Sequence, residues 1–218
     1  MFLSFFFYAK ILVSKEFKRR WDYQLVGKEQ RYNEILTAAR SVLAEKGFDD
    51  TKVSEIVERA GVAKGTFYLY FPSKLNLVIA LVQEMRENIL LESEKVIGLK
   101  GTHQEELMQV IKIAFEVMEK YDDVFPIFNA VSAFKTELWQ EEKEIRTPYF
   151  NFLKALIEKG QVSGEFRSDL NLDMISSLIE GMVEHIAHEC FIYHSGYPID
   201  EYLSTVNDIL GKALSNGN

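Results

Sequence analysis

The stretch from Thr51 to Lys74, TKVSEIVERAGVAKGTFYLYFPSK, constrains the fold of this chain more than any other part. Its apolar residues recur at helical spacing over Val53–Ala60, so this segment is predicted to be a short amphipathic helix. Gly61 follows where the chain must turn sharply, and Val62 can fill the angle between two helices. A helix, a tight glycine turn and a second helix are typical of the helix-turn-helix motif, which places its second helix in the major groove of DNA.

The second helix of this motif is predicted from Ala63 to about Tyr70, with Phe67 returning apolar bulk to the core. The side chains left free to face outward are Lys64, Thr66, Tyr68 and Leu69. The ring of Pro72 pushes Phe71 toward an extended conformation, which ends the helix. Ser73 can then cap the long helix that follows. The segment is therefore predicted to be a short helix that presents polar groups and fits the major groove of DNA.

These residues resemble the tetracycline-repressor (TetR) family of bacterial transcriptional regulators. The residues that carry the resemblance are Ile35-Leu36-Thr37-Ala38-Ala39, Glu45-Lys46-Gly47-Phe48, Thr51, Ile56, Ala60-Gly61-Val62 and Lys64-Gly65-Thr66-Phe67-Tyr68-Leu69-Tyr70-Phe71-Pro72-Ser73-Lys74. The rest of the chain shows only a helical pattern compatible with the family's variable regulatory domain. The resemblance implies an all-α fold, in which an N-terminal three-helix helix-turn-helix DNA-binding domain is followed by a helical ligand-binding and dimerisation domain.

Carried over position by position, the resemblance implies a DNA-contacting surface at the start of the first motif helix and along the second. The residues concerned are Lys52, Ser54, Ala63, Lys64, Gly65, Thr66, Tyr68, Leu69, Tyr70 and Lys74. Lys64 supplies a cation for phosphate, Lys74 resembles a phosphate clamp, and the hydroxyl group of Tyr68 can form a neutral hydrogen bond. Ala63 and Leu69 depart from the family pattern, which often has serine and a polar or cationic residue there. Apolar contact with a thymine methyl group is one use for them.

The formal net charge of −8 over 218 residues is unusual for a DNA-binding protein until it is divided along the chain. Residues 28–74 hold eight Lys or Arg against seven Asp or Glu, residues 1–27 have a net charge of +3, and residues 75–218 have −12. Acidic residues are thus concentrated away from the predicted DNA surface. We expect an N-terminal extension at 1–27, a DNA-binding domain at 28–74 with its motif at about 51–70, and a helical regulatory and dimerisation domain at 75–218.

The N-terminal run MFLSFFFYAKILV is apolar except for Lys10. It is shorter than the about twenty apolar residues of a membrane span, and it lacks the basic start and the cleavage site of a signal peptide. We expect residues 1 to about 25 to be an extension or an extra helix that packs on the body. Cys190 is the only cysteine, so no internal disulfide can form and nothing points to secretion. The expected location is the cytoplasm, with no membrane partner.

Past Lys74 the sequence predicts helix after helix. The predicted segments are Ser73 to about Ile97, Thr102 to Met118, a short segment Ile127–Lys135, Leu138 or Glu141 to Lys159, Leu172 to about Tyr193, and Ile199–Leu214. Thr102-His103-Gln104-Glu105 is typical of a capping box. A break is expected at 122–126, and Gly160 and Gly164 are expected to frame a loop. The first helix, about 35 Å long at about 1.5 Å per residue, can act as a lever between the two domains.

By the resemblance, the helices at about 141–160 and 172–193 pair with their counterparts in a second subunit. Ser177, Gly181 and His188 lie along one side of the second of these helices. A glycine inside a helix costs about 1 kcal/mol relative to alanine unless close packing offsets the loss. The alternative is that Gly181 contacts another helix of the same subunit. A two-fold homodimer presents two recognition helices, so a palindromic double-stranded DNA operator is expected.

Large, adaptable side chains of the body can line an apolar pocket for a small-molecule effector, which the resemblance implies. They are Phe115, Met118, Phe125, Phe128, Phe134, Trp139, Phe150, Met174, Met182 and Phe191. Each of them also fits a plain hydrophobic core. A cationic effector is expected if Glu116 or Glu184 points into the pocket, and a long apolar or amphipathic one otherwise. We expect no cofactor. We expect the DNA-binding domains to have two tilts, of which one fits the operator and the other is preferred by the ligand-bound protein. Ligand binding would then release the operator, and the expected output of the DNA-bound protein is repression.

Two other functions remain open from the sequence. Glu184, His185 and His188 share a helical face, so they could serve a helical metal-binding or ligand-binding protein or an enzyme. The cluster lacks the His-Glu-x-x-His order of zinc peptidases, and no serine or cysteine nucleophile has a recognisable setting. We therefore expect neither a metal site nor an enzyme. The second alternative is a ligand-binding protein that has lost DNA binding, which only Ala63 and Leu69 favour.

Overall fold

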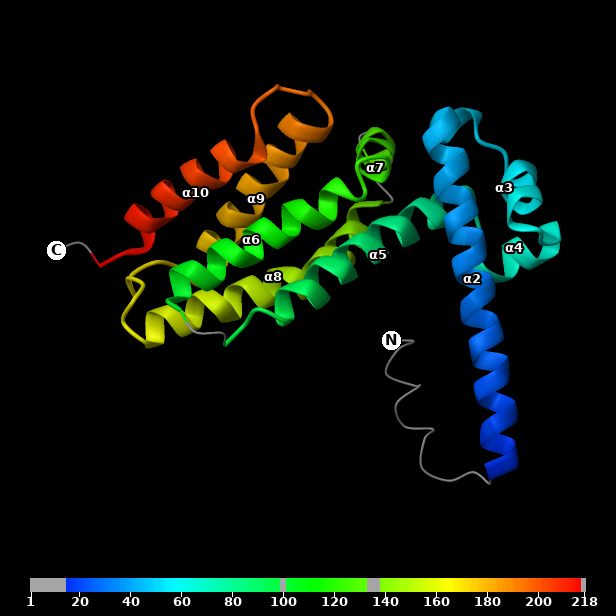
Figure 1. The fold of residues 1–218 in the computed structure, drawn as a ribbon, viewed down its shortest axis with the longest axis horizontal. Coiled ribbons are helices and arrows are strands. Elements are labelled where there is room, and N and C mark those ends of the chain that lie inside the picture. Colours follow the sequence, from blue (N-terminus) through cyan, green and yellow to red (C-terminus); the bar gives the residue numbers. More distant parts are fainter. Residues whose placement is uncertain (1–14, 99–100, 133–137, 217–218) are drawn as a thin grey trace.

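The computed structural model describes residues 15–98, 101–132 and 138–216, with the backbone alone for residues 15–26, 132, 138–140 and 142. Within these ranges the regular structure is helical, apart from one isolated β-bridge between Phe166 and Ser215. The helices are α2 (Lys15–Asp50), α3 (Val53–Ala60), α4 (Lys64–Tyr70), α5 (Lys74–Glu94), α6 (His103–Glu119), α7 (Val124–Ser132), α8 (Leu138–Val162), α9 (Leu172–Phe191) and α10 (Ile199–Leu214). Helices α2 to α4 lie at one side of the molecule, and α6 to α10 gather along α5 at the other (Figure 1). The predicted all-α fold is confirmed.

Helix α2 crosses the domain boundary expected between residues 27 and 28 without a break. Its first half extends away from the other helices (Figure 1). The helix is interrupted at Gly47, whose φ of 73° and ψ of 178° suit a residue without a Cβ atom. The hydroxyl group of Thr51 donates to the carbonyl oxygen of Gly47 at 2.6 Å and thereby holds this bend. Thr51 does not cap α3, because Lys52 occupies the N-cap position.

The turn between α3 and α4 has the predicted form. Gly61 adopts the left-handed conformation with a φ of 66°, and the N–H of Val62 donates to the carbonyl oxygen of Val57 at 3.0 Å. Val57 and Phe67 are buried on the inner sides of the two helices. Phe71 is extended, with φ −128° and ψ 105°, and ends α4 as expected for a residue before proline. The motif thus turns the outer side of α4 away from the core.

Helix α5 links the two parts of the molecule. The hydroxyl group of Ser73 accepts a hydrogen bond from the N–H of Asn76 at 3.3 Å, as predicted for its cap. The buried residues of α5 pack against α2, α6, α7 and α8, and they include Leu77, Val78, Leu81, Met85 and Ile89. In the described part of the chain no single helix is both long and apolar enough to span a membrane. Only α4 and α5 taken together meet both requirements, and they are bent by 55° relative to each other.

Two carboxylates accept hydrogen bonds from backbone N–H groups at the start of α6. Thr102 and Glu105 form the predicted capping box, with the hydroxyl group accepting from the Glu105 N–H at 3.1 Å and the carboxylate accepting from the Thr102 N–H at 2.8 Å. Glu165, from the loop after α8, accepts from the N–H groups of His103 and Gln104 at 2.8 and 2.9 Å. Because these N–H groups have no partner inside the helix, Glu165 joins the α8–α9 loop to the start of α6.

Two boundaries in the body differ from prediction. The expected loop does not begin at Gly160, because α8 continues through this buried residue to Val162. The expected break at 122–126 is shorter, because α7 begins at Val124. Pro126 lies in the first turn of α7, where the missing N–H of proline removes no intrahelical hydrogen bond. Both differences lengthen helices that line the body's cavities.

Candidate DNA-binding and effector sites

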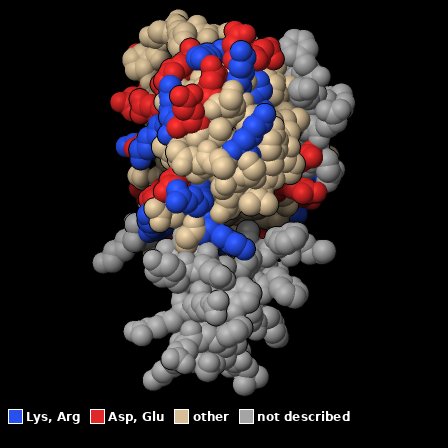
Figure 2. Space-filling view, turned by 90° about the vertical axis from the view of Figure 1, so that its right-hand side faces the viewer, with Lys and Arg blue, Asp and Glu red and all other residues tan. Residues whose placement is uncertain are grey.

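Helices α3 and α4 present one outer surface, to which the predicted DNA-binding residues contribute. Those that are exposed on it are Lys52, Ser54, Ala63, Lys64, Gly65, Tyr68 and Leu69. Leu69 is 83% exposed, so its side chain has almost no packing role in its own subunit. Figure 2 shows this end of the molecule, with lysine and arginine side chains interspersed among acidic ones. The surface can therefore offer hydroxyl, cationic and apolar groups together.

Two of the predicted residues on α4 are only half-buried rather than fully exposed, namely Thr66 and Tyr70. The ring of Tyr70 lies edge-on to Tyr32 of α2, with 6.3 Å between the ring centroids, and 6.5 Å from Phe71. Aromatic pairs at this separation stabilise packing. Tyr70 therefore contributes to the contact between α4 and α2, and its assignment to the DNA surface stays a prediction.

Ion pairs on the helix-turn-helix leave two lysines available. Lys46 pairs with Glu55 at 2.6 Å, and Arg59 pairs with Glu45 at 2.5 Å. The hydrogen bond from Arg59 lowers the pKa of Glu45, so this carboxylate stays charged near neutral pH. Among the described residues, the exposed Lys52 and Lys64 have no ion-pair partner. These two ammonium groups are free to approach a phosphate.

Lys74 lies differently from what was predicted for a phosphate clamp. Its ammonium group donates to the carbonyl oxygens of Phe48 and, at 2.8 Å, of Thr51, and it lies 4.3 Å from the centre of the Phe48 ring. Burial lowers the pKa of Lys74, although Asp49 and Asp50 oppose this effect. The side chain thus ties the start of α5 to the bend after α2. The assignment of Lys74 as a phosphate ligand is corrected to this structural role.

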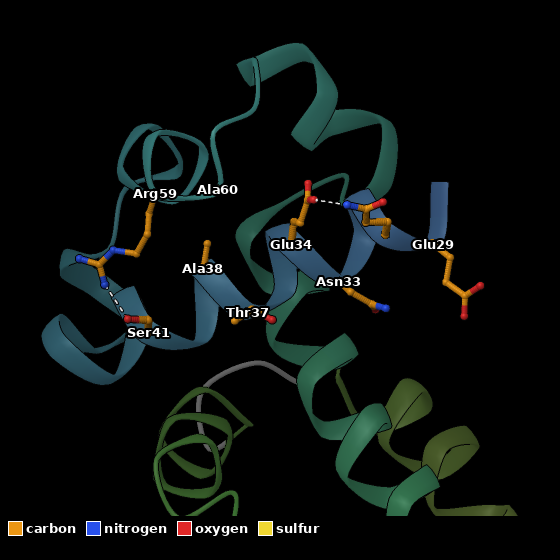
Figure 3. A pocket seen from close by; sticks show the side chains of 9 residues that line it. Glu29, Asn33, Glu34, Thr37, Ala38, Ser41, Arg59 and Ala60 are labelled. Carbon is orange, nitrogen blue, oxygen red and sulfur yellow. Dashed lines mark hydrogen bonds between the residues drawn. The ribbon is translucent and has the colours of Figure 1, made fainter. Parts of the chain in front are cut away.

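A groove of about 890 Å³ lies between α2 and α3 on the DNA-binding part (Figure 3). Arg59 reaches across it from α3 and donates to the hydroxyl group of Ser41 at 2.7 Å. The groove is open to solvent, and its α2 wall carries mainly polar side chains such as Glu29, Asn33 and Glu34. None of the predicted DNA or effector residues lines it.

The residues predicted to form an effector pocket fall into several groups. Phe115 and Met118 are fully buried in the core of the body. Phe125 and Phe128 line a small cavity. Met174 is 69% exposed on α9, so its assignment to a pocket is wrong. Phe150, Met182 and Phe191 are half-buried, whereas Phe134 and the side chain of Trp139 lie outside the described residues.

Two cavities of the body share one residue. The inner cavity, of about 70 Å³, lies among α5, α7 and α9, and its wall includes Val82, Phe125, Phe128, Asn129, Glu184 and His188. The cleft, of about 260 Å³, lies between α5 and α8, and its wall includes Gln83, Glu87, Glu141, Glu144, Pro148 and Tyr149. The volume of each is smaller than that of a typical ligand pocket, which is about 300 to 1,000 Å³. Arg86 of α5 lines the inner cavity and the cleft alike.

Arg86 is held by a buried group of charges. Its Nη2 atom lies 2.6 Å from Glu184 Oε1, and its Nη1 atom lies 3.6 Å from Glu180 Oε1. Arg146 of α8 also reaches Glu180, at 2.9 Å. The Arg86 and Glu180 side chains are only 11% and 2% exposed, so each charge needs these partners to offset the loss of water. Next to them, burial raises the pKa of the Tyr149 hydroxyl group, which therefore stays protonated.

The DNA-binding part is tied to the body at Arg40 of α2. Its Nε atom donates to both carboxylate oxygens of Asp123, at 2.8 and 3.0 Å, and its guanidinium group lies 4.5 Å from the centre of the Tyr121 ring. The Tyr121 hydroxyl group donates to Glu84 of α5 at 2.8 Å. Burial and this hydrogen bond raise the pKa of Tyr121 to about 12, so the phenol remains a donor. One cluster therefore joins α2, α5 and the residue before α7.

The predicted dimer residues do not all lie on one surface. Ser177 and Gly181 are exposed on α9, and no atom lies within 4 Å of a Cβ built on Gly181. The alternative that Gly181 packs against another helix of its own subunit is therefore wrong. His188 instead lies with its ring 5.1 Å from Phe125, and its Nδ1 atom lies 2.7 Å from the carbonyl oxygen of Glu184. The structure thus places His188 against α7, away from the outer surface of α9.

The proposed metal cluster does not converge on one point. The Glu184 carboxylate pairs with Arg86, and the exposed His185 ring lies 3.9 Å from Glu189. His188 faces Phe125, as described above. In the part of the chain that the structure describes, no three His, Cys, Asp or Glu side chains are placed to hold a metal ion. The geometry therefore does not favour the metal or enzyme alternative.

Sequence reasoning missed the charged residues inside the body. Arg86 and Glu180 each stand on a buried helix side, and Glu180 shares its side with Val183 and Ala187 at helical spacing. A lone charge in such an apolar stripe is a usable signal, since buried charges need partners. The pairing of Arg40 with Asp123 had no such signal, because their separation of 83 positions leaves no local pattern.

Comparisons with known proteins agree with this geometry. Residues 35–81 match the family model for bacterial regulatory proteins of the tetR family, and residues 107–214 match a tetracyclin repressor-like C-terminal domain. The fatty acid metabolism regulator protein of Bacillus subtilis (strain 168) is 29% identical over 191 residues, covering 87% of this chain and 98% of the relative. The uncharacterized HTH-type transcriptional regulator YvdT of the same organism is 32% identical over 191 residues, covering 84% of this chain and 95% of the relative.

A solved structure resembles most of the described fold. The transcriptional regulator FadR from Bacillus subtilis, in complex with stearoyl-CoA, superposes with a TM-score of 0.74 at 29% identity, covering 84% of this chain and 99% of that chain. The likeness thus extends through both the DNA-binding part and the body. The chain belongs to the tetR family of bacterial regulatory proteins and is a ligand-responsive, DNA-binding transcriptional regulator.

Proposed function

We propose that this regulator represses transcription as a two-fold dimer, which binds a palindromic operator and releases it when a fatty acyl thioester enters the body. The observation that carries the proposal is the outer surface of α4, where Lys64, Tyr68 and Leu69 are exposed and Lys64 has no ion-pair partner among the described residues. The DNA-binding domain is residues 28–74 and the regulatory domain is residues 75–218, with residues 1–27 as an extension. The protein acts in the cytoplasm, by binding rather than by catalysis.

On DNA, α4 lies in the major groove and the start of α3 lies near the backbone. Lys52 and Lys64 contact phosphates, because their ammonium groups are exposed and available. Tyr68 donates a hydroxyl hydrogen bond to a phosphate or a base edge. Ala63 and Leu69 contact thymine methyl groups, which suits their exposed apolar side chains. With few free cations, affinity for unrelated DNA is modest.

The outer surface of α8 and α9 supports the dimer. Met174, Leu178 and Val162 are large apolar side chains that are more than half exposed. Exposed Gly181 lies three positions after Leu178 on α9, on the same side of the helix, and lets a partner helix approach closely. Neighbouring exposed apolar groups of this kind mark interaction sites. Because the two recognition helices of a dimer face successive turns of the duplex, the operator has two half-sites.

The effector class rests on the likeness to a regulator that binds stearoyl-CoA and on the aromatic wall of the inner cavity. Glu184 also lines this cavity, but its carboxylate is paired with Arg86 at 2.6 Å, so it does not call for a cationic effector. Phe125 and Phe128 of α7 offer apolar surface to a hydrocarbon chain. At about 70 Å³ the cavity is too small for such a chain, so binding must move α7. Asp123, directly before α7, would then move relative to Arg40 of α2. Ligand binding thus favours a tilt of the DNA-binding domain that no longer fits the operator.

The test is binding to the DNA upstream of the protein's own gene, with and without stearoyl-CoA. Wild type should retard this DNA, and stearoyl-CoA should release it. The double substitution Lys64→Ala with Tyr68→Ala should weaken binding at least tenfold without loss of helicity. The matched control is Lys112→Ala with Tyr197→Ala, since both residues are exposed on the body. Equal affinity of the two double variants would refute the recognition surface, and DNA binding unaffected by stearoyl-CoA would refute the effector class.

A further inference from the structure

The walls of the inner cavity and of the cleft share one side chain. Arg86 lines both, and its Nη2 atom is held at 2.6 Å by Glu184, which stands on the wall of the inner cavity. Its other partner, Glu180, lies at 3.6 Å from Nη1. Because this one guanidinium group borders both spaces, its movement would enlarge both at once. Separately they are too small for a typical ligand.

The cleft contains polar groups that are buried without partners. Within the described part of the chain, the Tyr149 hydroxyl oxygen and the Glu141 Oε2 atom are both inaccessible to solvent and have no hydrogen-bond partner. Tyr149 as a whole is 2% exposed. A buried hydroxyl or carboxylate oxygen that lacks a partner costs free energy, so such atoms in a native protein call for a missing group. Both residues line the cleft, so a ligand that opens the closed cleft further would reach both atoms from the same side.

The charges around the cleft select the kind of group that fits. The guanidinium of Arg86 is already paired with Glu180 and Glu184. The cleft wall also carries Glu87, Glu141 and Glu144, so carboxylates outnumber cations there. A phosphate or a free carboxylate would be repelled. An uncharged group with an acceptor for the Tyr149 hydroxyl and an N–H donor for Glu141 would be held, and an amide beside an ester carbonyl has both.

We infer that the two cavities are the closed form of one effector site, in which Arg86 is the gate and the cleft holds an uncharged amide or ester group through Tyr149 and Glu141. The hydrocarbon chain of the ligand then passes Arg86 into the inner cavity beside Phe125. This inference deepens the proposed function, because it assigns the residues that distinguish an acyl ester or amide from a free fatty acid. The phosphates of a coenzyme A ester remain outside the cleft.

The recognition step is tested with three probes, namely stearoyl-CoA, decanamide and decanoate, and with the substitution Tyr149→Phe. The inference predicts that decanamide binds wild type at least fivefold more tightly than decanoate. Tyr149→Phe should weaken decanamide binding about fivefold to tenfold, as for the loss of one buried hydrogen bond, and should not lower the melting temperature of the ligand-free protein. The control is Tyr202→Phe, which removes a hydroxyl bonded to Ser195 on the far side of the body.

The gate is tested by the rate at which the uncharged fluorescent probe Nile red enters the protein. Arg86→Met should raise this rate at least tenfold, whereas Arg146→Met should not, although it also removes a cation from Glu180. Should Arg86→Met fail to fold, Glu184→Gln, which frees one side of Arg86, replaces it. The inference is overturned by equal entry rates, by decanoate binding as well as decanamide, or by no binding of any probe. If decanamide binds as expected but stearoyl-CoA does not, only the proposed effector class fails.

Discussion

The guanidinium group of Arg40 and the carboxylate of Asp123 form a bidentate ion pair, in which Nε and Nη2 of the arginine lie within 3.0 Å of the aspartate oxygens. The pair joins the first helix of the DNA-binding part to the residue directly before α7. Because Phe125 and Phe128 of α7 line the inner cavity, the same short helix touches the proposed ligand and carries the anchor of the DNA-binding domain. The hydrogen bond to Asp123 raises the pKa of Arg40, so the guanidinium group stays charged across the physiological range.

The substitution Asp123→Asn should weaken this link while keeping the shape of the side chain. We expect the free energy of unfolding to fall by about 1 to 2 kcal/mol, as for a half-buried charged hydrogen bond. We also expect stearoyl-CoA to change DNA affinity less in the variant than in wild type, because movement of α7 no longer pulls on Arg40. The measurements are urea unfolding and the ratio of DNA dissociation constants with and without ligand. Asp208→Asn, in an exposed pair with Lys212, is the control.

Lys74 and Lys64 should behave differently on DNA. Lys74→Met keeps the long stem over Phe48 but loses the hydrogen bond to the Thr51 carbonyl, so we expect lower stability of the DNA-binding domain. The dependence of log Kd on log salt concentration should stay unchanged. Lys64→Met should leave stability unchanged and reduce that slope by about 0.9, the value for one lost phosphate contact. If Lys74→Met reduces the slope as Lys64→Met does, Lys74 binds phosphate after all.

The helix-turn-helix could be predicted from the sequence because its determinants are local. Gly61 at a left-handed turn and Phe71 before a proline fix the ends of α3 and α4 within a few residues. The cavities could not be predicted, because they depend on which helices meet. Arg86 and Glu184 are 98 positions apart, and no pattern along the chain indicates that they touch. Met174 was assigned to a pocket by residue type alone, which does not distinguish an inward side chain from an outward one.

The exposed glycine on α9 provides a test of the dimer. Gly181→Leu adds a bulky side chain where nothing in the same subunit is within 4 Å of a Cβ atom. The isolated subunit should therefore gain helix stability, of about 0.8 kcal/mol by propensity. If α9 pairs closely with a second subunit, the leucine should instead shift the protein toward monomer at micromolar concentration. Analytical ultracentrifugation of this variant and of Ser204→Leu, an exposed site on α10, decides the matter. If both variants remain dimers, the interface lies elsewhere.

Gly160 should be the least replaceable glycine of the body. A Cβ atom there would lie 2.2 Å from the ring of Phe166, which is 2% exposed and whose N–H donates to the Gly160 carbonyl oxygen at 2.9 Å. Overpacking in Gly160→Ala should lower the free energy of unfolding by about 1 to 3 kcal/mol. The higher helix propensity of alanine should offset about 1 kcal/mol of this loss. Gly211→Ala on α10 is the matched control, since its nearest atom would be 3.9 Å away. Thermal unfolding should show a lower melting temperature for the first variant and a slightly higher one for the second.

Glu165 should make stability depend on pH. Partial burial raises the pKa of this carboxyl group, but hydrogen bonds from the N–H groups of Gln104 and His103 outweigh burial, and the pKa lies below its ordinary value of 4.5. Because the folded pKa is lower than the unfolded one, the carboxylate stabilises the protein above the unfolded pKa. That stabilisation is lost as the pH falls through the folded pKa.

The comparison is between wild type and Glu165→Gln, by urea unfolding at neutral pH and at a pH well below 4.5. At neutral pH the variant should be less stable by about 1 kcal/mol, as for the loss of a charged helix cap. The difference should shrink at the acidic pH, because protonated glutamate and glutamine are both uncharged. Glu158→Gln, at an exposed position on α8, should show no such change. If the difference in free energy of unfolding between wild type and Glu165→Gln is the same at both pH values, the charge of Glu165 does not contribute. In that case the side chain acts through its shape, because protonation removes the charge and leaves the shape unchanged.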